Sequence, residues 1–160
     1  MHKRIEDHVD ERLTGNAHQN AARFVAHLRA NEMLFERGKG YWEDKIYWMI
    51  KYKNEYVCFI LINGSSARDD PWIIWSDDSD SHGFEDALLD EQTKEMAWAH
   101  VDFCGNCGGD CRPGSRKIIF GKTFEHVCRT TMKFINPDAV TLACAEKMVD
   151  IRKQNILRNA

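Results

Sequence analysis

The sequence predicts an α+β fold in which helices flank an antiparallel sheet of about four to five strands. Three observations predict this fold: apolar residues at helical spacing near both ends, runs of aromatic and β-branched residues between them, and a cluster of cysteines. We expect a single domain over residues 1–160, helical over 1–35 and sheet-rich over 41–80, with a cysteine loop at 103–114 and helices over 122–158.

Two helices are expected at the start of the chain. Ile5, Val9 and Leu13 recur every four residues, which is typical of one narrow helical face. A second helix over 17–32 is predicted because its apolar residues follow the i, i+3, i+4, i+7 spacing. Those residues are Ala21, Phe24, Val25 and Leu28.

Three strands are expected next, at 47–52, 56–62 and 72–76, because these segments are rich in aromatic and β-branched residues. The polar residues 53–55 predict a hairpin between the first two strands. The segment 56–62 is apolar on both of its faces, which is typical of a central strand.

The second half of the chain predicts a helix that ends near residue 96, followed by a strand that leads into the cysteines. A short strand is expected at 117–121 and a helix at 124–134, where apolar and polar residues separate onto two helical faces. Asn136 and Pro137 then begin a last helix that runs to about residue 157.

Composition and charge exclude several classes of protein. Hydrophobic residues make up 43% of the chain and charged residues 29%, and no apolar run is long enough for a membrane helix. The first residues are charged and show no secretion signal, so we expect a cytoplasmic protein with no membrane partner. The net charge of −3 combines an acidic segment over 1–100 with a basic segment over 101–160.

Cysteine is the unusual component, with six residues, three of which lie within 104–111. Clustered cysteines without a secretion signal are more typical of metal binding than of a disulfide scaffold. Cys104 and Cys107 have the C-x-x-C spacing that places two thiolates on one tight turn around a metal ion, and glycine follows the pair. With Cys111, this segment resembles the half-site of zinc knuckles and zinc ribbons. The resemblance lacks a second C-x-x-C, so it implies structural zinc and no particular family.

A fourth ligand would complete a tetrahedral zinc site. We expect it to be Cys128 or His100, whereas a water molecule in that position would leave the site open for catalysis. A redox dithiol of Cys104 and Cys107 is another interpretation. An iron–sulfur cluster is disfavoured, because arginine, not proline, follows the last clustered cysteine.

Four tryptophans near the predicted sheet are candidates for a ligand pocket: Trp48, Trp72, Trp75 and Trp98. The alternative is that these side chains pack in the core or on a face of the sheet. Cys58 and Cys144 are interpreted as core residues.

The sequence therefore predicts a small cytosolic, zinc-stabilised binding or regulatory module for a small ligand or a protein partner. One alternative is an enzyme that uses Cys104, Cys107 and Cys111 as a zinc site or a dithiol. A second is a weak nucleic-acid binder through the basic segment 112–133, although nucleic-acid sites usually have a broader basic surface. The basic residues of that segment are Arg112, Arg116, Lys117, Lys122, Arg129 and Lys133.

Overall fold

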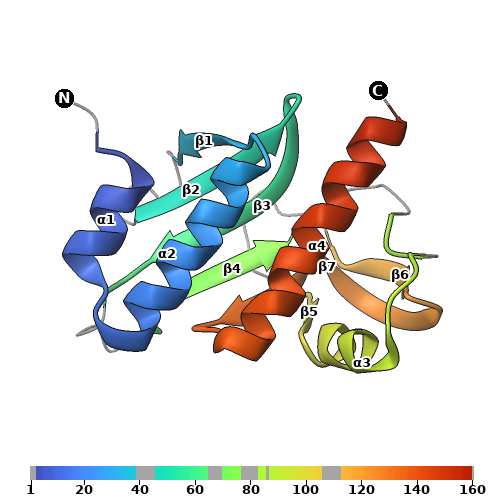
Figure 1. Cartoon of the computed structure of the whole chain (residues 1–160). Coiled ribbons are helices and arrows are strands. Elements are labelled where there is room, and N and C mark those ends of the chain that lie inside the picture. Colours follow the sequence, from blue (N-terminus) through green and yellow to red (C-terminus); the bar gives the residue numbers. More distant parts are fainter. Residues whose placement is uncertain are drawn as a thin grey trace.

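A seven-stranded antiparallel sheet with four helices forms the part of the chain that the computed structural model describes, residues 3–38, 46–64, 70–76, 83–85, 87–105 and 113–159 (Figure 1). Along the chain the elements are α1 (Ile5–Arg12), α2 (Gly15–Ala30), β1 (Leu34–Arg37), β2 (Ile46–Tyr52), β3 (Glu55–Ile62), β4 (Trp72–Ser76), α3 (Glu91–Ala99), β5 (Val101–Phe103), β6 (Ser115–Ile119), β7 (Lys122–Ile135) and α4 (Ala139–Arg158). The α+β class predicted from the sequence is confirmed.

The strands follow the spatial order β1-β2-β3-β4-β7-β5, and β6 also pairs with β7. Strands β2, β3 and β4 form a meander, in which Trp48 lies opposite Ile60 and Ile60 lies opposite Ile74. Phe134 of β7 continues this row, because it pairs with Ile74. Strands β1 and β5 therefore lie at opposite ends of this order.

The sheet is larger than the four to five strands expected, because neither β1 nor β7 was predicted. The helix predicted over 124–134 is wrong, because Lys122–Ile135 is one long strand. Its register shifts against β5, where Val101 pairs with Met132 and Phe103 pairs with Val127. This irregularity interrupts the alternation of a regular strand, so the apolar residues of β7 acquire a helix-like spacing.

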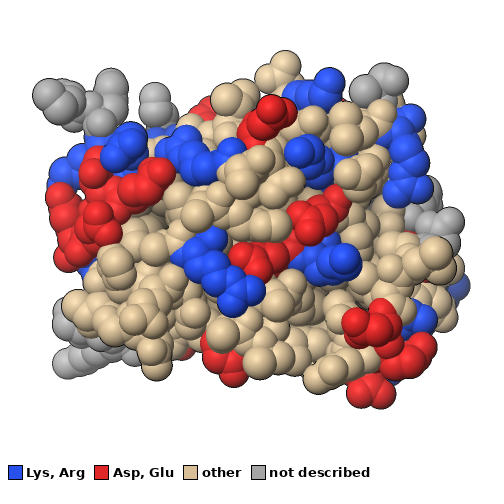
Figure 2. All heavy atoms as spheres, in the orientation of Figure 1, with Lys and Arg blue, Asp and Glu red and all other residues tan. Residues whose placement is uncertain are grey.

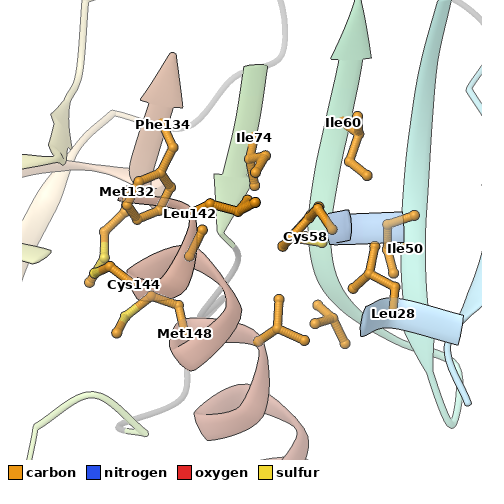
Figure 3. Close-up of a cluster of buried hydrophobic side chains, with 14 of the residues drawn as sticks. Leu28, Ile50, Cys58, Ile60, Ile74, Met132, Phe134, Leu142, Cys144 and Met148 are labelled. Atoms are coloured by element: carbon orange, nitrogen blue, oxygen red, sulfur yellow. The ribbon is translucent and has the colours of Figure 1, made fainter. Parts of the chain in front are cut away.

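Helices α2 and α4 lie side by side across one face of the sheet, and α1 packs beside α2 (Figure 1). Their apolar sides and the facing strands form the core. Figure 3 shows Leu28 of α2 and Leu142 of α4 directed toward the layer that contains Ile60, Ile74 and Phe134. The side chains of all five residues are buried, so the helices are held mainly by apolar contact.

Cys58 and Cys144 also lie in this core (Figure 3), as the sequence predicts. Among the described residues, no helix combines the length and the apolar character needed to cross a membrane.

Candidate functional site

The cysteine loop begins and ends at one point of the sheet. Cys104 follows β5 directly, and its backbone N–H donates to the carbonyl oxygen of His126 in β7 at 2.7 Å. Gly114, on the far side of the loop, packs against the same place: a Cβ atom on Gly114 would lie 2.7 Å from Cys104 Cβ and 2.7 Å from the His126 carbonyl. Residues 104 and 114 therefore meet at His126.

Cys128 lies on β7, two residues beyond this meeting point, and is half-buried. Its surroundings are polar. The Thr130 hydroxyl donates to Cys128 Sγ at 3.4 Å, and the Cys128 thiol is hydrogen-bonded to the carboxyl group of Asp102 on β5. Cys128 thus lies on a strand and not on the helix predicted over 124–134, and its place on β7 brings it to the base of the loop.

Asp102 is a residue that sequence reasoning missed. Burial raises the pKa of its carboxyl group, while Lys133 and the hydrogen bond from Cys128 act in the opposite direction. An acidic residue between Val101 and Phe103 of a predicted strand was the available signal. A carboxylate beside a thiol can accept the proton that the thiol releases, or can itself bind a cation.

His100 lies at the other end of β5 from Cys104. Its Nδ1 is 2.8 Å from the carbonyl oxygen of Met96, and its ring stacks on Phe134 with the ring centres 4.9 Å apart. The His100 carbonyl also accepts from the backbone N–H of Lys133 at 2.9 Å. These contacts fix the imidazole by the end of α3, whereas the loop base lies at the other end of the strand.

Cys107 and Cys111 lie outside the described residues, and so does Arg112. Within the described part of the chain, no three His, Cys, Asp or Glu side chains form a group that can hold a metal ion. The four-cysteine site and its zinc-knuckle geometry therefore stay predictions. What the structure adds is that Cys104, directly after β5, and Cys128, on the paired strand β7, both lie at the base of the loop.

A cavity of about 330 Å³ lies against β5 and β7. Its polar wall consists of His100, Asp102 and Lys133, so an imidazole, a carboxyl group and an ammonium group face one space. This combination provides a cation, an acidic group and hydrogen-bond donors and acceptors, and Asp102 connects the cavity to the Cys128 thiol.

The four candidate tryptophans occupy different environments. Trp72 is completely buried and packs against Phe24 with the ring centres 6.2 Å apart. The indole N–H of Trp98 donates to the Ile119 carbonyl oxygen at 2.7 Å. The ammonium group of Lys133 lies over the ring of Trp75, 5.6 Å from the ring centre. These three contacts are typical of packing.

Trp48 differs from the other three, because it lines a larger cavity of about 520 Å³ beside α1 and β1. Sequence reasoning singled out none of the basic residues around this cavity.

Several cations of the basic segment have partners within the chain. Arg116 pairs with Glu125 at 2.7 Å. The ammonium group of Lys117 donates to the Thr131 hydroxyl at 2.7 Å and to the Arg129 carbonyl at 3.2 Å, where it holds the irregular part of β7. Lys122 lies over the rings of two aromatic residues, at 5.2 and 5.4 Å from their centres. These contacts join the three side chains to the sheet whether or not the segment binds a partner.

Comparisons of the chain with protein-family models, with curated proteins and with solved structures found no significant match.

Proposed function

We propose that this chain is a small zinc-stabilised binding or regulatory module, in which Cys104, Cys107, Cys111 and Cys128 hold one zinc ion. The observation that carries the proposal is the meeting of Cys104 and Gly114 at His126, beside Cys128. The segment that contains the other two cysteines therefore starts and finishes next to Cys128. Four thiolates around one ion are a common structural zinc site.

The donor set fits zinc. Zinc prefers thiolate and imidazole ligands in tetrahedral geometry, and the loop supplies three thiols within eight positions, 104–111. Cys128 is favoured over His100 as the fourth ligand, because it lies at the loop base while His100 is held by Met96 at the far end of β5. Bound zinc would contribute folding free energy by joining the loop to β7.

Metal analysis of the untagged full chain tests this proposal. We expect about one zinc ion per chain, with loss of the metal and a lower melting temperature in Cys104→Ala and Cys128→Ala. Cys144→Ala is the matched control, because it removes a buried thiol that packs in the core, and it should keep its zinc. Zinc-free protein, or zinc that persists in both ligand variants, would contradict the proposal.

An enzyme is the second candidate, and one observation favours it. The cavity lined by His100, Asp102 and Lys133 borders β5 and β7, and Asp102 also contacts the Cys128 thiol. If water occupied the fourth position, Asp102, which contacts Cys128, would be a candidate to hold a proton. The visible spectrum of the cobalt-substituted protein separates the two candidates, since four thiolates and three thiolates with an oxygen ligand give different ligand-field bands. An unchanged spectrum in Cys128→Ser would favour the open site.

A further inference from the structure

The larger cavity, of about 520 Å³, lies among α1, the C-terminal part of α2, β1 and β2. Four of its lining side chains are cationic, Lys3, Arg4, Arg29 and Arg37, and the lining residues that the structure describes include no Asp or Glu. Most of the remaining wall is apolar. This volume lies in the range of small-molecule sites.

Two of these cations are neutralised by carboxylates just outside the cavity. Arg29 forms two hydrogen bonds with Glu6, at 2.9 and 3.0 Å, and Lys3 pairs with Glu11 at 2.7 Å. Arg4 is different. The nearby Asp7 carboxylate accepts from the backbone N–H of Arg4 at 2.9 Å, and the Arg4 guanidinium forms no ion pair with a described carboxylate. Arg4 therefore gives the cavity a guanidinium group without an ionic partner among the described residues.

Figure 2 shows Lys and Arg side chains gathered at the upper left, over the start of α1 and the end of α2. Acidic side chains lie beside them, which agrees with the pairing of Arg29 and Lys3.

The inner wall contains two polar groups that lack partners. His8 is 9% exposed and Trp48 is 6% exposed, and their rings lie 5.9 Å apart. His8 Nδ1 and Trp48 Nε1 are both buried, and neither forms a hydrogen bond within the described part of the chain. Buried polar atoms are usually hydrogen-bonded, and the indole nitrogen of Trp72, in the core, is a third exception among the described residues.

His8 is uncharged at neutral pH, so the attraction of this site for anions comes from its arginines. Burial lowers the pKa of His8, and the positive charges of Arg37 and Lys3 lower it further. The imidazole is therefore neutral at pH 7 and presents one donor and one acceptor nitrogen.

We propose that this cavity binds a small organic anion, with its carboxylate or phosphate group near Arg4 and Arg37 and its apolar body against Trp48. Guanidinium groups suit both anions, because their planar N–H groups match two oxygens at once. The site goes beyond the proposed zinc function. It lies at the β1 edge of the sheet, while the cysteine loop begins at β5, at the opposite end of the strand order.

Four probes test the proposal on the full-length chain: 2-naphthoate, 2-naphthyl phosphate, neutral 2-naphthamide and inorganic phosphate. Isothermal titration calorimetry gives the affinities, and the two naphthyl anions show which head group the site prefers. We expect at least one naphthyl anion to bind more tightly than the amide and more tightly than inorganic phosphate. In nuclear magnetic resonance spectra, binding should shift the indole N–H signal of Trp48, identified by its loss in Trp48→Phe.

Arg4→Gln should weaken binding of the naphthyl anion by about ten- to a hundredfold, because a charge-assisted hydrogen bond is lost. Arg116→Gln is the matched control, since Arg116 is an exposed arginine with a carboxylate partner near β7, and it should bind as the parent chain does. Equal binding of amide and anion, absence of binding by both anions, or equal loss in the two variants would overturn the proposal.

Discussion

Gly114 and Cys104 approach so closely that a methyl group on Gly114 would lie 2.7 Å from Cys104 Cβ. The same methyl group would meet backbone atoms of His126 at 2.7 Å, so side-chain movement alone does not relieve the clash. We expect Gly114→Ala to open the base of the cysteine loop and to cost about 1–3 kcal/mol of unfolding free energy, the usual range for overpacking. Urea denaturation measures this cost.

Gly105→Ala is the matched control for this prediction. Gly105 lies in the same loop, and no atom of the described residues would lie within 4 Å of its Cβ. Its substitution should leave stability and zinc content nearly unchanged. Equal effects of the two substitutions would show that the close approach at Gly114 is not what holds the loop.

The sequence predicted the middle of the sheet well, because β2, β3 and β4 are continuous runs of sheet-forming residues. Ile46–Tyr52, Glu55–Ile62 and Trp72–Ser76 match the expected strands to within one residue. Strand β7 was not predicted. Its irregular pairing includes Thr131, a buried β-branched residue at φ 66°, which no local propensity indicates.

The sequence identified Cys104 but neither Asp102 nor the cavity at Arg4, because only the first belongs to a local motif. A C-x-x-C spacing is local, so Cys104 could be selected from the sequence alone. The position of Asp102 beside Cys128 depends on the pairing of β5 with β7, which joins residues far apart in the chain. The cavity at Arg4 and Trp48 likewise assembles residues from α1 and β2 that share no motif.

Arg152 anchors α4 to the sheet from a buried position and provides a stability test. Its side chain is 5% exposed, and its Nε donates to the Tyr56 carbonyl oxygen of β3 at 2.9 Å. Arg152→Met would keep the apolar stem but remove the donor, so we expect a loss of about 1–3 kcal/mol in unfolding free energy.

Glu55→Gln is the control for Arg152. Glu55 is 63% exposed at the side chain and lies 3.8 Å from the Arg152 guanidinium, so its charge should contribute little. Urea denaturation of both variants compares the buried hydrogen bond with the exposed ion pair. A larger loss in Glu55→Gln would contradict this assignment.

The cysteines should differ in reactivity. Burial raises the pKa of the Cys144 thiol to about 11, and the negative charge of Asp90 acts in the same direction. At about pH 8 only about a thousandth of this thiol is ionised, so alkylation should be very slow in the folded protein. Cys58, also buried, should be protected by lack of access.

Iodoacetamide labelling followed by mass spectrometry measures this difference. With a chelator present, Cys104 and Cys128 should be labelled well before Cys144, because both are half-buried. In denaturant all cysteines should react. If zinc binds as proposed, omitting the chelator should protect Cys104 and Cys128 as well. Labelling of Cys144 as fast as Cys104 in folded protein would contradict the prediction.

His8 should make the fold sensitive to mild acid. Burial lowers the pKa of His8 below its ordinary value of 6.5, Arg37, Lys3 and Arg12 lower it further, and Glu11 opposes them. As the pH falls through about 6.5, the unfolded chain binds a proton at His8 before the folded chain does. Above this pH, His8 therefore does not change the unfolding free energy with pH. Below it, the unfolding free energy falls progressively as the pH falls.

His8→Phe isolates this contribution, because phenylalanine keeps a ring beside Trp48 but does not titrate. Unfolding free energies of the parent chain and the variant are compared at about pH 7.5 and about pH 5.5. We expect the parent chain to lose more stability than the variant between these two values. The variant also removes the unpartnered Nδ1 atom at both pH values, and because only the parent chain titrates, its stability relative to the parent chain should be greatest at the lower pH. Equal losses in both proteins would mean that His8 binds its proton equally well in the folded and unfolded states.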